Sequence, residues 1–290
     1  MFRVFFILLL TLFTCQATAV SYEREFKQIE SRYNRMVPHI IKLSDQFGIS
    51  AELITATIYK ESTFKPTAAN PKSTARGLMQ LTRPTAKAMI SKYGKQLGIR
   101  HGANLYDPHV NMKLGVAYLH DVREVVERKI NRKATDAEIY LAFKYSPERA
   151  AKMIRARGNT RMVDFYGAAA TGNPKDYFHK GRALTVAESK RNITGGFKRA
   201  KAFYGPKIAK DVAMHRAKEA MLTAKNLERR VFQQVLRGYK KLNPPVEPQW
   251  MASTAKLNPV HRHIETDATY QAYADVNTMT SGRTYKGIPL

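Results

Sequence analysis

Apolar side chains recur every three or four residues along most of the chain, which is the period of α-helices that bury one face. The pattern predicts a helix over residues 22–45 and a second one that begins after Ser50, a residue type favoured just before a helix. Further helices are expected over residues 84–93, residues 107–130 and from Thr135 onward. No run of alternating β-branched residues is long enough for a sheet, so the pattern predicts an all-α fold.

One acidic residue falls on the apolar face of the second helix. Ile54, Ile58 and Glu61 share one side of that helix, and Pro66 ends it soon afterwards. A carboxyl held against apolar side chains is harder to ionise, so its pKa rises and it can donate a proton near neutral pH. Glu61 is therefore the candidate catalytic acid.

Glycosidases usually pair such an acid with a second carboxylate at a fixed distance. The chain has no Asp or Glu over residues 62–106, so a second acid would have to come from farther along the sequence. The candidates for that role are Asp107, Asp136, Glu138 and Asp164. Asp107, which precedes Pro108, is better explained as the residue that caps the next helix.

The N-terminus is typical of an exported protein. Residues 1–19 combine a short basic start, an apolar run of about ten residues and a small-residue site, Ala17-Thr18-Ala19, as secretory signal peptides do. The only cysteine, Cys15, lies inside this segment, so thiol chemistry and disulfides are not expected in the mature chain. The bulky residues before Cys15 disfavour a lipoprotein site. The expected location is the periplasm or cell envelope, and association with a virion is an alternative.

Positive charge is the second strong feature of the 290-residue chain. The 49 Lys and Arg residues exceed the 23 Asp and Glu residues by 26. Such a surface favours anionic polymers, and with an export signal nucleic acid is an unlikely partner. Residues 181–250 alone carry a net charge of +11, and residues 206–242 have the pattern of one long helix. This helix either packs on the preceding domain or binds anionic wall or membrane polymers.

Three motifs around Glu61 occur in an order and spacing known from one enzyme family. They are Glu61-Ser62, then Gly77-Leu78-Met79-Gln80, then Asn104-Leu105-Tyr106-Asp107-Pro108 with Asn111, Gly115, Tyr118 and Leu119. In these motifs the chain resembles the soluble lytic transglycosylases, enzymes that cleave peptidoglycan and have a goose-lysozyme-like helical fold. The resemblance covers about residues 37–178.

The resemblance implies cleavage of the β-1,4 bond between N-acetylmuramic acid and N-acetylglucosamine, with formation of a 1,6-anhydro ring. Glu61 would act first as general acid and then as general base. The implied substrate-binding residues are Ser62, Asn70, Gly77, Met79, Gln80, Asn104, Tyr118 and Tyr145. For Ser62, termination of the helix is an equally good explanation. Most family members also place a Tyr near the catalytic carboxyl, at the position of Phe143, and Tyr145 is the expected substitute.

The region of Phe143 is closest in layout to phage and phage-related members of the family. The matching positions are Tyr140-Leu141-Ala142, Pro147, Ala150-Ala151 and Asn173-Pro174. Two alternatives stay open: a hydrolytic lysozyme on the same fold, and a non-catalytic protein that binds peptidoglycan or builds a virion. No cofactor is expected, and no metal, because none of the eight histidines forms a ligand pair with supporting carboxylates.

The expected domain organisation has four parts. Residues 1–19 are the signal peptide and residues 20–180 the lysozyme-like domain. Residues 181–250 are a basic helical extension, and residues 251–290, which are polar and weakly periodic, are a flexible tail.

Overall fold

The computed structural model describes the backbone of residues 2–166 and 174–243, and the side chains there except those of residues 2–21 and 165–166. Asn173 and the expected tail, residues 251–290, lie outside the described residues, as do the side chains of the expected signal peptide. Within the described part, no helix is both long enough and apolar enough to span a membrane.

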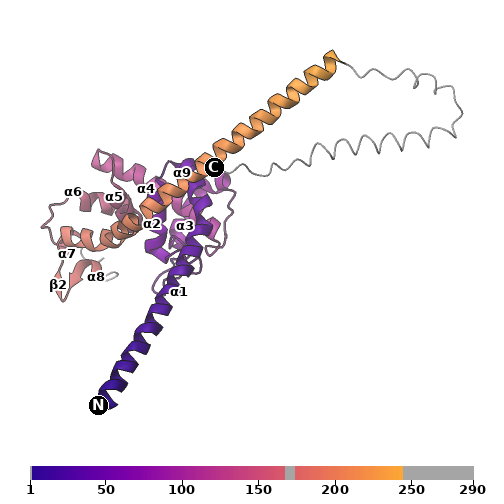
Figure 1. The fold of residues 1–290 in the computed structure, drawn as a ribbon. Helices are drawn as coiled ribbons and strands as arrows, with labels where there is room; N and C mark the ends of the chain where they lie inside the picture. Colours follow the sequence, from indigo (N-terminus) through magenta and orange to yellow (C-terminus); the bar gives the residue numbers. More distant parts are fainter. Residues whose placement is uncertain (1, 167–173, 244–290) are drawn as a thin grey trace, which may run out of the picture. The chain divides into compact units, whose positions relative to one another are not determined.

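The described chain is built almost entirely from helices, which confirms the predicted all-α fold (Figure 1). The helices are α1 (Phe2–Phe47), α2 (Ala51–Ser62), α3 (Arg83–Leu97), α4 (Pro108–Ile130), α5 (Asp136–Tyr145), α6 (Pro147–Arg155), α7 (Met162–Tyr166), α8 (Pro174–Tyr177) and α9 (Val186–Leu242). A small antiparallel hairpin joins β1 (Phe178–His179) to β2 (Arg182–Ala183) just before α9.

The helices begin where the sequence supplies capping side chains. Ser50 accepts a hydrogen bond from the Leu53 amide at the start of α2, and Asp107 accepts bonds from two amides at the start of α4. Thr135 and Glu138 form a reciprocal capping box at the start of α5. The Arg132 guanidinium, bonded to the Glu138 carboxylate, lowers the pKa of Glu138 to about 2.

The same arrangement of side chains recurs at the start of α9. Thr185 and Glu188 exchange backbone bonds, and Arg182 pairs with Glu188 at 2.7 Å. Helix α9 therefore begins at Val186 rather than at Pro206, where the sequence suggested a start. Pro206 and Pro38 both lie inside long helices, and both are exposed, so water can reach the carbonyl group that each leaves without a donor.

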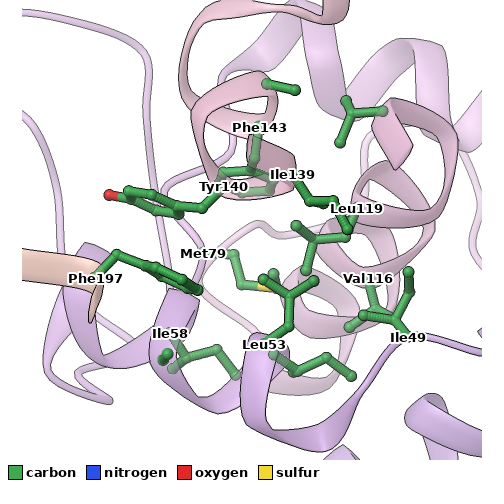
Figure 2. Close-up of a cluster of buried hydrophobic side chains, with 14 of the residues drawn as sticks. Ile49, Leu53, Ile58, Met79, Val116, Leu119, Ile139, Tyr140, Phe143 and Phe197 are labelled. Atoms are coloured by element: carbon green, nitrogen blue, oxygen red, sulfur yellow. The ribbon is translucent and has the colours of Figure 1, made fainter. Parts of the chain in front are cut away.

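Helix α4 lies at the centre of the core and contacts α1, α3, α5 and α6. Its buried face includes Leu114, Val116 and Leu119, all without exposed surface. Figure 2 shows side chains of α4 and α5 meeting those of α2 and the loop residue Met79 in one apolar cluster. This cluster fixes α2 and α5 as neighbours, and the candidate site lies where those two helices meet.

The first part of α9 belongs to the same core. Tyr204 of α9 is buried, and its ring lies 5.0–5.4 Å from the rings of Tyr33, Tyr59 and Phe64. Asp211 accepts a hydrogen bond of 2.6 Å from the Tyr33 hydroxyl. Helix α9 is thus held to α1 and α2 by both apolar and polar contacts.

This packing corrects the domain boundary expected at residue 180. The structure divides into a compact unit that ends at Met221 and a second unit from Leu222 onward. The sequence suggested a separate extension because residues 181–250 are rich in charge. In the structure the apolar stripe of residues 186–208 is buried in the first unit, and the charged side chains face outward.

Candidate active site

The last turn of α2 positions Glu61. Ile54 and Ile58, two turns and one turn earlier on the same face, have no exposed surface, whereas Glu61 is partly buried. Directly after the helix, Thr63 and Phe64 adopt φ angles of 50° and 58°, in the left-handed region that side-chain-bearing residues rarely occupy. Such strain collects at functional sites, where the surrounding packing maintains it. Here the ring of Phe64 is buried and anchors the turn that ends α2 directly after Glu61 and Ser62.

A hydroxyl from α5 contacts the Glu61 carboxyl. Tyr140 donates a hydrogen bond of 2.8 Å to Glu61 Oε1. The Tyr140 ring is buried and stacks on Phe197 of α9, with ring centroids 4.6 Å apart and planes inclined by 10°. Figure 2 shows the Tyr140 hydroxyl oxygen at the edge of the apolar cluster, with Phe197 against the ring. The carboxyl at the end of α2 is therefore bonded by α5, and α9 supports the ring that carries the bonding hydroxyl.

Burial is the main influence on the Glu61 carboxyl. It raises the pKa of Glu61 above the ordinary value of 4.5. The Tyr140 hydrogen bond and the charges of Lys144 and Lys60 act in the opposite direction but do not outweigh burial. The pKa of Tyr140 is also raised, first by burial and then by the charge of Glu61, so its hydroxyl stays a donor. The site holds a carboxyl that can carry a proton at higher pH than a surface glutamate.

The hydroxyl beside Glu61 does not come from the expected residue. Tyr145 donates its hydrogen bond to Asp176 instead, and Phe143 packs against Tyr118 with ring centroids 5.3 Å apart. Tyr140 supplies the hydroxyl that was expected from Tyr145. It can do so because Tyr140 lies on the same face of α5 as Phe143, the position where a hydroxyl was expected, three residues earlier. That spacing is the sequence signal that identifies Tyr140.

A second carboxyl, Asp176 of α8, lies close to this group of side chains. It is buried, accepts the Tyr145 hydroxyl, and has Lys144 Nζ 3.9 Å from Oδ2. Its charge also raises the pKa of Tyr140, which places it within electrostatic reach of the Glu61 partner. Asp176 was not among the second acids considered from the sequence.

The four acids that the sequence offered have other partners. Asp107 caps α4, and Glu138 caps α5 and binds Arg132. Asp136 pairs with Lys201 of α9. Asp164 pairs with Arg161 at 2.6 Å. Each is therefore occupied in a structural contact.

Asn111 of α4 organises the loop that carries the Gly-Leu-Met-Gln motif. Its side chain accepts a bond from the Met79 amide and donates bonds to the Arg76 and Leu105 carbonyls, all at 2.8–2.9 Å. Gly77 has φ +79°, and a Cβ there would lie 2.3 Å from the Asn111 amide. Only glycine fits this approach, so Gly77 is needed for the loop itself.

Gln80 ends this loop in a strained conformation, with φ 46°. Its side-chain amide donates bonds of 3.0 and 2.9 Å to the Ala68 and Gly77 carbonyls. The amide nitrogen is therefore engaged by the backbone, and glycan recognition by Gln80 would rest on its side-chain oxygen. Met79 lies entirely in the core and has no exposed surface in this conformation.

The remaining predicted residues take local structural contacts. Ser62 donates to the Ile58 carbonyl at 3.1 Å and so helps end α2, without a bond to Glu61. Asn70 and Asn104 are exposed, and each accepts the amide two residues ahead, which stabilises their turns. Tyr118 is partly buried beneath Phe143. In the described part of the chain, no group of His, Cys, Asp and Glu side chains is arranged to hold a metal ion.

The described part of the chain is all-α and holds a partly buried acid at the end of α2, as expected for a lysozyme-like domain. Residues 38–161 match the family model of the transglycosylase SLT domain. This segment is therefore an SLT-type domain, and the resemblance seen in the sequence motifs is confirmed over it.

The similar proteins are named as lytic transglycosylases. The membrane-bound lytic murein transglycosylase C of Pectobacterium atrosepticum is 34% identical over 91 residues, which are 31% of this chain and 25% of the relative. The same-named protein of Serratia proteamaculans is 33% identical over the same shares. An inactive mutant of lytic transglycosylase Slt from Pseudomonas aeruginosa shares 22% identity, with a TM-score of 0.41, over 59% of this chain and 24% of that one. The chain thus spans about a quarter of the curated relatives' length.

Proposed function

We propose that this protein is a peptidoglycan lytic transglycosylase with Glu61 as its general acid and base. The observation that carries the proposal is the Glu61 carboxyl itself: partly buried, with a raised pKa, and hydrogen-bonded by Tyr140. The SLT-type domain and the names of the similar proteins support the substrate class. A signal peptide in residues 1–19 and action in the cell envelope form part of the proposal.

In the proposed reaction, protonated Glu61 donates its proton to the glycosidic oxygen between N-acetylmuramic acid and N-acetylglucosamine. The bond between that oxygen and the anomeric carbon of N-acetylmuramic acid then breaks, N-acetylglucosamine leaves with the donated proton on its 4-hydroxyl, and the 2-acetamido group stabilises the cation that develops on the remaining sugar. Ionised Glu61 then takes the proton of the sugar's 6-hydroxyl, whose oxygen bonds to the anomeric carbon and closes the 1,6-anhydro ring. An intramolecular hydroxyl competes well with water because its effective concentration is high. Tyr140 and Lys144 stabilise the carboxylate form between the two proton transfers.

The first test is Glu61→Gln, which keeps the shape of the side chain but removes its acid. Release of muropeptides from purified sacculi should fall about 100- to 10,000-fold, because one group supplies both proton transfers. Mass spectrometry of the parent's products should show 1,6-anhydro ends and no reducing muramic acid. Near-parent turnover by a folded Glu61→Gln protein would remove Glu61 from the mechanism. Binding of sacculi without cleavage by the parent would favour the non-catalytic alternative.

The same variant tests the raised pKa through stability. Because the folded state holds the Glu61 proton more tightly than the unfolded state, the parent loses stability as pH rises from about 4.5 through the raised value. Glu61→Gln has no such loss. It should therefore melt at a higher temperature than the parent at pH 7, and the difference should vanish below about pH 4. Equal melting temperatures across this range would contradict the raised pKa.

Asp176 is the observation that favours a second candidate, a hydrolytic lysozyme on the same fold. A buried carboxyl near Tyr140 is the kind of group that could orient a water molecule. Asp176→Asn separates the two candidates. A transglycosylase should still release 1,6-anhydro products, whereas a hydrolase should lose its reducing-end products. Products that borohydride reduces at muramic acid, made by the parent and lost in Asp176→Asn, would favour the lysozyme.

A further inference from the structure

The last part of α9 exposes an unusual number of large apolar side chains. We define the α9 C-terminal segment as Leu222–Leu242, the described helical part of the second unit. Each of the following residues exposes more than half of its surface: Leu222, Leu227, Val231, Phe232, Val235, Tyr239 and Leu242. Single exposed apolar residues are ordinary, but a row of them on one helix marks an interaction surface.

The helical period sorts the residues of this segment into two faces. With 100° between successive residues, the apolar side chains of Leu227, Val231, Phe232, Val235, Leu236, Tyr239 and Leu242 fall within one half of the helix circumference. The other half carries polar and basic side chains, namely Asn226, Arg229, Arg230, Gln233, Gln234, Arg237, Lys240 and Lys241. Three residues depart from the division: Leu222 lies on the polar side, whereas Glu228 and Lys225 lie within the apolar half.

The charge of the segment has one sign. Six Lys and Arg residues stand against the single acid Glu228, a net charge of +5. A helix with a wide apolar face, a cationic polar face and an aromatic residue near one end suits the boundary between acyl chains and anionic headgroups. We propose that the α9 C-terminal segment lies in the surface of an anionic lipid bilayer, parallel to its plane.

Two other occupants fit the segment less well. Anionic wall polymers would satisfy Arg229, Arg230 and the other cations, but they offer no apolar medium for Phe232 and Val235. A second copy of the helix could cover the apolar face. It would, however, bring cations such as Lys225 and Arg229 together at the margins, with only Glu228 to pair with them. A bilayer satisfies both faces at once. This inference does not depend on the glycan chemistry proposed for Glu61.

The test measures co-sedimentation of the full chain with lipid vesicles. One set is phosphatidylcholine alone, and the other contains about one-third phosphatidylglycerol as the anionic lipid. The key variant is Phe232→Ser with Val235→Ser on the apolar face. Its matched control is Gln233→Ser with Gln234→Ser, which introduces the same two serines on the opposite, polar face. The apolar N-terminal run is present in every protein, so any difference belongs to α9.

The parent should bind the anionic vesicles more tightly, and the apolar-face variant should bind them at least about tenfold more weakly. The control should match the parent. Arg229→Gln with Arg230→Gln should weaken binding to anionic vesicles alone, and salt should reduce the preference for them. Equal binding by the apolar-face variant and its control would overturn the proposal. Binding to sacculi but not vesicles would assign the segment to wall polymers, and a dimer dissociated only by the apolar-face change would assign it to a second copy.

Discussion

The hydrogen bond between Tyr140 and Glu61 joins residues 79 positions apart. It places a hydroxyl beside the candidate acid although the tyrosine expected from the family resemblance is absent. The family position holds Phe143, whose ring packs against Tyr118. One helical step earlier, Tyr140 points its hydroxyl at Glu61 Oε1. A hydroxyl therefore contacts the candidate acid from a position three residues earlier on the same face of α5.

Tyr140→Phe should therefore reduce activity without unfolding the protein, because the ring and its stack on Phe197 remain. Loss of a hydrogen bond to a charged group should lower the rate by about 10- to 100-fold. The hydroxyl lowers the pKa of Glu61, so its removal should raise that pKa further and move the alkaline limb of the pH–rate profile to higher pH. The measurement is turnover of soluble glycan fragments as a function of pH.

Tyr145→Phe is the matched control for this prediction. It removes a hydroxyl from the same helix, but one that donates to Asp176 rather than Glu61. Its alkaline limb should stay close to that of the parent. If both variants shift the profile equally, the hydroxyl of Tyr140 has no special role at the acid.

Among the elements, α9 supports the candidate site, although its sequence is rich in charged residues. Its first turns are capped by Thr185 and Glu188, and its buried stripe then passes the end of α2. Phe197 supports the Tyr140 ring, and Gly196 lies against Lys60, whose Cε would be 2.6 Å from a Cβ at that position. The helix that follows the SLT-type segment is therefore part of the site's support.

Phe197→Leu tests this support. Leucine keeps most of the buried apolar surface but loses the ring stack, worth about 0.5–1.5 kcal/mol. Thermal unfolding should show a small loss of stability, and turnover should fall further than that loss explains, because Tyr140 is less well held. Phe203→Leu on the same helix is the control, since Phe203 is exposed. Equal effects of the two changes would mean that α9 does not position Tyr140.

For the whole molecule, the division after Met221 separates the part that folds around the site from the amphipathic segment. A chain that stops after residue 182 would lack Ile193, Phe197, Tyr204 and Ile208, all of which are buried. Removing so many core side chains should abolish cooperative unfolding, since each such loss costs about 2–5 kcal/mol.

A chain that stops after Met221 keeps these residues and should behave differently. It should unfold cooperatively, as followed by circular dichroism, and cleave short soluble glycans at nearly the parent's rate. At low salt it should bind sacculi and anionic vesicles less well than the parent, because it lacks the cations of the second unit. The difference should shrink at physiological ionic strength, where charge attraction is screened beyond about 8 Å. Loss of cleavage of short glycans in the folded shorter chain would place the second unit within the catalytic part.

The sequence alone determined those features that depend on neighbours along the chain. Ser50, Asp107 and Thr135 mark helix starts because capping is a bond across two or three residues. Glu61 falls on an apolar face because Ile54 and Ile58 precede it at helical spacing. The spaced motifs identified the SLT-type segment for the same reason, since each one describes a local turn or helix end.

Only the tertiary structure decided which distant side chains meet Glu61. The choice of Tyr140 over Tyr145, the presence of Asp176 and the stack of Phe197 all depend on how α5, α8 and α9 pack. Local periodicity gives the face of each helix but not its neighbour, because many partners can bury the same apolar stripe. The high charge of α9 likewise concealed that its first part is core. The charged residues of α9 lie on its exposed face, whereas its packing in the core depends on the apolar residues of the opposite face.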